Sequence, residues 1–258
     1  MNQQTFTAQL RSILRDNGGR RLVRGQTSGI LDTTRLARLA VPTNGRPNVF
    51  AHVEARRDVS YHVGLLLDAS GSMAERNNSG VRRFEAAYAA AHGLARALHS
   101  AGCAVSAAAF NQYLRFLPTA ELVSGAPRLF AEYADMAQRV GYHQNYDASA
   151  LELMRRHMMK QRESVRLVIV LSDGCPTDTI NERLRGAYEA VGAWYESQQD
   201  ALPQVVRRCE AGGVAVVGIG INSSDVRSYY KRAAVVDNLT DLYPTMLAQV
   251  GAVIKRGR

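Results

Sequence analysis

The sequence predicts an α/β fold: a doubly wound, mostly parallel six-stranded sheet flanked by helices, with one antiparallel edge strand. The first reason is a set of short apolar runs typical of strands buried on both faces, at Val63–Leu67, Val165–Leu171 and Val214–Ile219. The second is that segments with helical spacing separate these runs, most clearly Val81–Ser100. Strands that alternate with helices are typical of parallel sheets with helices on both faces.

The remaining elements of this domain follow the same alternation. Further strands are expected at Cys103–Phe110, at Tyr113–Leu117, which returns antiparallel at the edge, and at Ala233–Val236. Further helices are expected at Ala126–Arg139, Asn145–Met159, Val226–Lys231 and Leu239–Ile254. A long helical region is expected over Asn181–Ala211, kinked or split at Pro203 because proline lacks a backbone donor.

The chain is predicted to divide into a basic N-terminal extension with short helices, residues 1–58, and a main domain, residues 59–258. The extension should contain a helix at Thr5–Arg15, a flexible basic connector at Arg20–Gly29, a second helix at Leu31–Ala40 and a strand or extended arm at Val49–Val53. In the second helix Asp32 is the expected N-cap, and Leu36 and Leu39 are expected to face inward.

The net charge of +9 is concentrated in this extension, where residues 1–58 carry ten arginines against four acidic residues. Such a surface suits an acidic protein partner, or it is simply a solvated arginine-rich face. An arginine-rich nucleic-acid-binding protein is the alternative hypothesis. We favour the first two explanations because no stacking aromatic side chains are interleaved with the arginines.

Three widely spaced cysteines, Cys103, Cys175 and Cys209, argue against a disulfide framework and are typical of a reducing compartment. No apolar run approaches the ~20 residues that span a bilayer, and no signal peptide is evident. We therefore expect a cytoplasmic protein that makes no membrane contact.

Oxygen-bearing side chains follow the first apolar run directly. Asp68, Ser70 and Ser72 occur at every second residue, with Gly71 between the serines allowing a sharp turn. In open α/β sheets, ligands bind at the carboxyl ends of the strands. No general base stands beside either serine, whereas one carboxylate and two hydroxyls suit a hard cation such as Mg²⁺.

Two later turns offer further oxygens, Asn145-Tyr146-Asp147 and Ser172-Asp173-Gly174. We expect Asp173 to complete a Mg²⁺ site with the first turn, and either Asn145 or Asp147 to contribute; Mn²⁺ and Ca²⁺ are alternative ions. Each residue also has a structural interpretation: Asn145 as a helix N-cap, Asp147 as a first-turn acid and Asp173 as an Asx turn.

These motifs resemble those of von Willebrand factor A (VWA) domains. Asp68, Ser70 and Ser72 match the D-x-S-x-S of the metal-ion-dependent adhesion site (MIDAS), and Asp173 matches the acidic residue of its third loop. The second loop usually offers a threonine, where this chain has Asn145 with Asp147 two residues on. The resemblance implies a Mg²⁺ whose open coordination position is filled by an acidic residue of a protein partner.

Longer stretches resemble the C-terminal VWA domain of the cobaltochelatase subunit CobT and VWA proteins associated with MoxR-type ATPases. They are SGILDTTRLARLA, LSDGCPTDT, GVAVVGIGI and DVRSYYKRAAVV. The resemblance implies a non-catalytic adaptor that works with an AAA+ ATPase of the MoxR or CobS type on a client protein. The alternative is a CobT-like subunit of a cobalt or magnesium chelatase; CobT itself is longer and carries an acidic N-terminal region that this sequence lacks.

Familiar catalytic motifs are absent from the sequence. It contains no Walker phosphate-binding loop and no dinucleotide-binding fingerprint. Asp68 stands where a nucleophile elbow would need glycine, and Ser70 stands where a haloacid-dehalogenase site would need a second aspartate. The sequence therefore favours a binding protein over an enzyme.

Overall fold

A computed structural model describes residues 8, 12, 20–40, 48–55, 59–76, 80–139, 144–174, 176–177 and 181–256. The chain divides into two units, one formed by Leu14–Val59 and one that contains Ser60–Arg258. Most of the predicted helix Thr5–Arg15 lies outside the described residues, as does Cys175.

The smaller unit is built on a three-stranded antiparallel sheet in the order β1-β3-β2. Its strands are β1 (Arg20–Gln26), β2 (Ile30–Leu31) and β3 (Phe50–Ala55). The predicted flexible connector at Arg20–Gly29 is therefore wrong, whereas the strand predicted at Val49–Val53 is confirmed. The strand was missed because the arginine-rich sequence of β1 lacks an apolar strand pattern. The strand is stabilised by pairing with β3, which lies far from it in the sequence.

The second helix of this region is a 3-10 helix, η1 (Thr33–Ala40), which begins at the predicted cap. Asp32 Oδ1 accepts hydrogen bonds from the Thr34 amide at 3.1 Å and the Thr34 hydroxyl at 2.6 Å. Leu36 and Leu39 do not face inward, since they are 38% and 55% exposed. Such a small unit has too little interior to bury every apolar side chain.

The larger unit is a six-stranded sheet in the order β6-β5-β4-β7-β8-β9. Its strands are β4 (Tyr61–Asp68), β5 (Ala104–Phe110), β6 (Leu114–Leu117), β7 (Val165–Ser172), β8 (Val214–Ile221) and β9 (Ala233–Val236). All neighbouring pairs are parallel except β5 and β6. The predicted fold class is confirmed, including the antiparallel edge strand.

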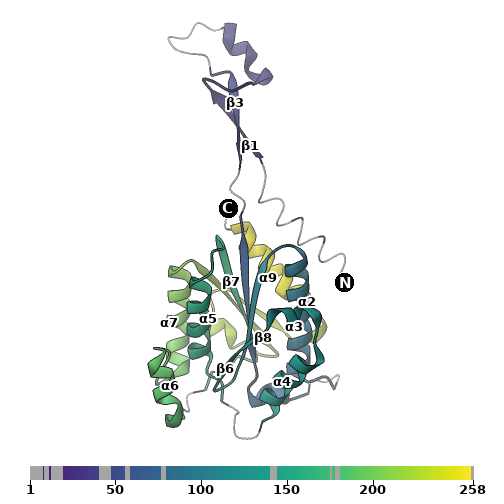
Figure 1. Cartoon of the computed structure of the whole chain (residues 1–258), viewed down its shortest axis with the longest axis vertical. Coiled ribbons are helices and arrows are strands. Elements are labelled where there is room, and N and C mark those ends of the chain that lie inside the picture. Colours follow the sequence, from purple (N-terminus) through teal and green to yellow (C-terminus); the bar gives the residue numbers. More distant parts are fainter. Residues whose placement is uncertain are drawn as a thin grey trace. The chain divides into compact units, whose positions relative to one another are not determined.

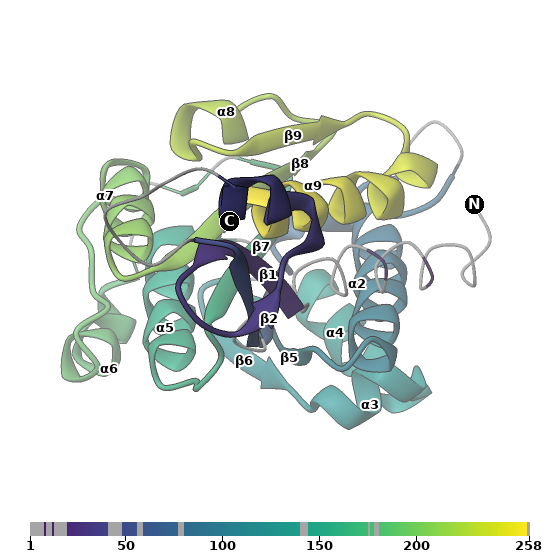
Figure 2. The ribbon, with the colours of Figure 1, turned by 90° about the horizontal axis from the view of Figure 1, so that it is seen from above.

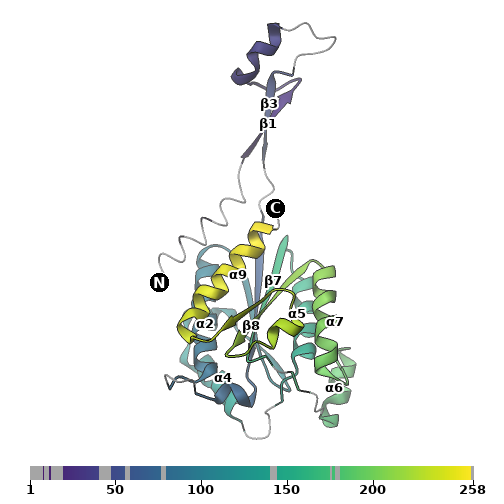
Figure 3. The ribbon, with the colours of Figure 1, turned by 180° about the vertical axis from the view of Figure 1, so that it is seen from behind.

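Helices cover both faces of this sheet (Figures 1 and 3). The main helices are α2 (Arg83–Ser100), α3 (Thr119–Ser124), α4 (Pro127–Gln138), α5 (Asp147–Met159), α6 (Arg185–Ala190), α7 (Gln198–Ala211), α8 (Val226–Tyr229) and α9 (Leu242–Arg256). The view from above shows α2, α3, α4 and α9 on one side, with α5, α6 and α7 on the other (Figure 2). Short 3-10 turns complete the unit: η2 (Gly71–Ala74), η3 (Glu182–Leu184) and η4 (Leu239–Asp241).

The core follows from strand alternation, because successive side chains point to opposite faces. Leu66 on β4 and Val168 on β7 pack with Met154 and Met158 of α5 in one buried cluster. Leu65 and Leu67 are also fully buried and point to the opposite face. Both faces of the central strands are thus apolar, as the continuous runs predicted.

The helical region after β7 is interrupted at a different place from the one predicted. Pro203 lies inside α7, and the break falls between α6 and α7, where Gly192 has a φ of 58°. The Ser197 side chain caps α7 by accepting from the Asp200 amide at 3.1 Å. α7 continues through Pro203 because the apolar face around Leu202 is packed into the core, and this packing compensates for the missing hydrogen bond.

Helix α3 was not predicted. It ends at Gly125, whose φ of 71° is the left-handed conformation common just after a helix.

Among the described residues, no helix is both long and apolar enough to cross a membrane.

Candidate metal centre

Three sequence-predicted turns meet at the carboxyl edge of the sheet. Asp68 is the last residue of β4, and Asp173 directly follows β7, the strand paired with β4. Asp147 is the first residue of α5 and is only 2% exposed. Parallel pairing puts the ends of β4 and β7 side by side. Residues far apart in the sequence therefore become neighbours: Ser172 donates a hydrogen bond to Asp68, 104 residues away.

Asp68 is fully buried and is held by three donors. Its Oδ1 accepts from the Ser70 amide at 2.7 Å, and its Oδ2 accepts from the Ser172 hydroxyl at 2.7 Å and the Asn145 side-chain amide at 2.9 Å. A carboxylate offers about four acceptor sites, so one site on Oδ1 remains for a further partner. Its orientation is therefore fixed before any ion binds.

The backbone beneath Asp68 is also anchored. The Tyr133 hydroxyl on α4 donates to the Asp68 carbonyl oxygen at 2.6 Å, and the Ala69 amide donates to the Phe110 carbonyl at 2.6 Å. These bonds tie the first turn to α4 and to the end of β5.

The second turn contributes two buried oxygens that are left without partners. Asn145 is 4% exposed, and its Nδ2 donates to Asp68 while its Oδ1 has no hydrogen-bond partner among the described residues. Asp147 Oδ2 is likewise buried without a partner in that part of the chain. A buried oxygen without a donor or cation is unfavourable, so both atoms fit an additional positive ligand.

Burial and mutual repulsion make ionisation of the carboxyl groups at this edge unfavourable. Burial first, and then the charge of Asp173, raises the pKa of Asp68 to about 7. Burial followed by the charges of Asp68 and Asp173 raises the pKa of Asp147 well above its usual value. Two neighbouring carboxylates that resist ionisation would be stabilised as anions by a cation between them.

The hydroxyls of the first turn lie close together, with 3.1 Å between Ser70 Oγ and Ser72 Oγ. Burial raises the pKa of Asp173, and the Ser72 hydrogen bond and the Arg83 charge oppose that rise. Ser70, Ser72 and Asp173 therefore lie together as predicted. No three of the described Asp, Glu, His or Cys side chains are close enough to hold a metal ion by themselves, so a cation here needs the hydroxyl or amide oxygens.

Several residues at this edge were not among the predicted ligands. Ser172 bridges the site by donating to Asp68 while accepting from the Gly174 amide at 3.0 Å. Arg83, the first residue of α2, lies 3.3 Å from Asp173 Oδ2 and 3.0 Å from Glu75 Oε2. Ser172 stands within a predicted oxygen turn, but no sequence spacing connects Arg83 or Tyr133 with the site.

A family model, described as the VWA domain of the cobalamin biosynthesis protein CobT, matches residues 124–256. The match covers just over half of the chain. The chain belongs to the CobT VWA-domain family. The matched region contains Asn145, Asp147 and Asp173, while Asp68, Ser70 and Ser72 precede it.

Solved structures place this family member within the VWA fold. BatB from Bacteroides thetaiotaomicron, a conserved hypothetical protein, aligns at 15% identity with a TM-score of 0.55, over 76% of this chain and 100% of that one. The vWF domain of the pilus tip protein Mfa5 from Porphyromonas gingivalis aligns at 12% identity with a TM-score of 0.50, over 78% of this chain and 98% of that one.

The pilus adhesin SpaC from Lactobacillus rhamnosus GG aligns at 14% identity with a TM-score of 0.52, over 78% of this chain. The chain spans only about a third of SpaC, since 31% of that protein is covered. These likenesses concern the fold alone. A comparison with curated proteins finds no significant match.

Proposed function

We propose that this CobT-type VWA protein is a non-catalytic adaptor that binds a partner through a Mg²⁺ ion at the edge formed by Asp68, Asp147 and Asp173. The observation that carries the proposal is a pair of buried oxygens, Asn145 Oδ1 and Asp147 Oδ2, which have no hydrogen-bond partner among the described residues. They accompany an Asp68 carboxylate already oriented by three donors. This donor set is entirely oxygen, which suits Mg²⁺, with Mn²⁺ or Ca²⁺ as alternatives.

In this proposal Asp68, Ser70 and Ser72 hold the ion from the first turn. Asn145 and Asp147 each offer a buried oxygen from the second turn, and Asp173 closes the site through a bound water. The ion supplies an electrophilic position that accepts a carboxylate from a protein partner. Arg83 Nη1 lies 3.3 Å from Asp173 Oδ2 and offsets part of the charge of that carboxylate.

The partner in this proposal is an AAA+ ATPase of the MoxR or CobS type, with the adaptor linking it to a client protein. We place the pair in the cytoplasm, because Cys103 and Cys209 are free, buried thiols of the kind that persist in a reducing compartment. Family membership is the support for this class of partner.

The test is a binding measurement between the purified chain and a MoxR- or CobS-type ATPase encoded in the same genome. Binding should require Mg²⁺, disappear with EDTA and be lost in Asp68→Asn. Glu196→Gln, which removes an exposed carboxylate outside the predicted metal ligands, is the matched control and should bind normally. Binding that is unchanged by EDTA and by Asp68→Asn would contradict the proposal.

A CobT-like chelatase subunit is the second candidate, favoured by the family match. It predicts that the chain, mixed with CobS-type and large chelatase subunits, supports ATP-dependent cobalt or magnesium insertion into a tetrapyrrole. The adaptor hypothesis predicts no insertion. Nucleic-acid binding, the remaining alternative, predicts steeply salt-dependent affinity that EDTA does not change.

A further inference from the structure

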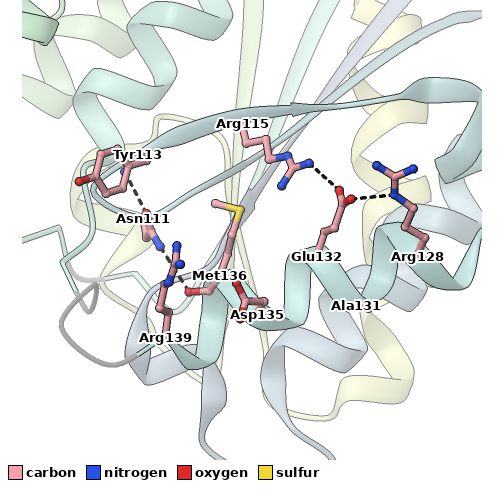
Figure 4. Close-up of a pocket in the computed structure, with 9 residues that line it drawn as sticks. All are labelled: Asn111, Tyr113, Arg115, Arg128, Ala131, Glu132, Asp135, Met136 and Arg139. Atoms are coloured by element: carbon pink, nitrogen blue, oxygen red, sulfur yellow. Dashed lines mark hydrogen bonds and ion pairs between the residues drawn. The ribbon is translucent and has the colours of Figure 1, made fainter.

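A pocket of about 500 Å³ lies beside the metal centre, between β6 and α4. Figure 4 shows Asn111 and Arg139 at one end of it and Arg115, Glu132 and Arg128 at the other. Three arginines, Arg115, Arg128 and Arg139, line the pocket, and no part of the proposed metal site uses it.

The pocket and the metal centre share their walls. Asn111 follows Phe110, the β5 residue paired with Asp68, and its carbonyl accepts from the Tyr146 amide of the second turn at 3.2 Å. Helix α4, which lines the pocket, carries Tyr133, the residue that donates to the Asp68 carbonyl. A ligand anchored at the metal would therefore meet this pocket next.

The walls near the metal centre are rigid. Asn111 is only 3% exposed; its Nδ2 donates to the Met136 carbonyl at 3.3 Å, and its Oδ1 accepts from the Tyr113 amide at 2.9 Å. These two bonds fix the turn between β5 and β6 against the end of α4. This end of the pocket is thus formed in advance of any ligand.

The far end of the pocket is an arginine pair around one carboxylate. Arg115 Nη2 lies 2.7 Å from Glu132 Oε2, and Arg128 Nε lies 3.0 Å from Glu132 Oε1. The arginine side chains are 50% and 80% exposed, and each guanidinium has five N–H donors. One carboxylate shared by two guanidinium groups leaves positive charge and donors directed to solvent.

We propose that this pocket binds a second acidic residue of the same partner segment whose first acidic residue occupies the metal. The proposal rests on the proposed function and specifies the partner: an extended acidic stretch of polypeptide. The Met136 and Ala131 side chains in the lining suit the aliphatic parts of such a segment, and the arginine pair suits its carboxylates.

The geometry sets the length of the segment. From Met136 back to Arg128, α4 rises about 12 Å at roughly 1.5 Å per residue. About four residues of extended chain cover that span. A peptide of six glutamates is therefore long enough to cover the length of the pocket, whereas a single N-acetylglutamate amide is not.

The test uses these two probes with the full chain in Mg²⁺, following fluorescein-labelled hexaglutamate by anisotropy and N-acetylglutamate amide by NMR. Arg115→Gln/Arg128→Gln should weaken hexaglutamate about fivefold or more and leave the short probe unchanged, because two exposed charge pairs are lost. Glu132→Gln, which removes the competing carboxylate, should strengthen hexaglutamate binding. Arg183→Gln/Arg207→Gln removes the same charge at exposed positions that do not line the pocket and should have no effect.

Three results would overturn the proposal: no hexaglutamate binding, equal affinity in the Arg115/Arg128 variant, or an equal loss in the Arg183/Arg207 control. Tighter binding of a ten-nucleotide single-stranded DNA with the same arginine dependence would also overturn it. The metal is tested separately by EDTA with the short probe. If only that arm fails, an arginine-dependent hexaglutamate affinity still supports the pocket as an acid-binding site.

Discussion

The guanidinium of Arg83 lies 3.3 Å from the carboxylate of Asp173, although 90 residues of chain separate them. Arg83 Nη2 also lies 3.0 Å from Glu75, and its side chain is only 20% exposed. The protein thus keeps a cation of its own at the edge where we propose a Mg²⁺ ion. That cation and the metal would repel one another.

Removal of this charge should therefore tighten metal binding. Arg83→Gln is expected to increase Mg²⁺ affinity about fivefold at low ionic strength, since a partly screened charge nearby is worth about 1 kcal/mol. Calorimetric titration measures the change. Arg96→Gln, at an exposed position on the same helix, should leave the affinity as it is. Weaker binding in Arg83→Gln would show that Arg83 supports the site rather than competing with the ion.

The Tyr133 hydroxyl anchors the Asp68 backbone, so its removal should destabilise the fold. Tyr133→Phe is expected to lower the free energy of unfolding by about 1–2 kcal/mol, because a buried carbonyl loses its donor. Urea denaturation monitored by circular dichroism provides the value. Tyr88 is the matched control: its ring stacks on Tyr133, but its hydroxyl is buried without a partner among the described residues. Tyr88→Phe should be neutral or stabilising, and an equal loss in both variants would refute the anchor.

The pKa of Asp68 predicts how pH acts on the metal-free protein. The folded value of about 7 lies above the unfolded value of 3.8, so between these pH values the folded state binds more protons than the unfolded state. In EDTA, this residue's contribution to stability should therefore fall as pH rises from about 4 to about 7. Mg²⁺ should bind more tightly over the same rise, because it requires the ionised carboxylate.

The contribution of Asp68 is isolated by measuring the free energy of unfolding in EDTA at a series of pH values. The wild type is compared with Asp68→Asn. The difference between the two proteins should shift in favour of the variant as pH rises from about 4 to about 7, and it should level off above pH 7. A constant difference would mean that the pKa of Asp68 is not raised in the folded state.

The third turn depends on Gly174, whose φ is 93°. A Cβ atom at this position would lie 2.9 Å from Ser223 Oγ in a backbone conformation that other residues rarely adopt. Gly174→Ala should cost roughly 1–3 kcal/mol of stability and also weaken Mg²⁺ binding by displacing Asp173. Gly186→Ala, in α6 with open space around it, should be neutral or slightly stabilising. Thermal denaturation distinguishes the two, and equal melting temperatures would contradict the assignment.

The features that could be predicted from the sequence are those that depend on residues close together in the chain. Buried strands are predicted by continuous apolar runs in the sequence. Asp68 and Asp173 stand at the ends of two such runs, so their position at the carboxyl edge of the sheet was also predicted. Features created by long-range pairing were missed. Strand β1 exists through its partner β3, and Ser172 acts on Asp68 only because β7 lies beside β4. Arg83 and Tyr133 reach the site from two different helices, and no periodicity records such a contact.

Anomalous diffraction from crystals soaked in Mn²⁺ tests the central claim most directly, since Mn²⁺ accepts the same oxygen ligands as Mg²⁺. The account predicts a single strong peak within ligand distance of Asp68 and the hydroxyls of Ser70 and Ser72, and no peak there in Asp68→Asn. An empty edge in fully soaked wild-type crystals, or a peak bound by other residues, would contradict it.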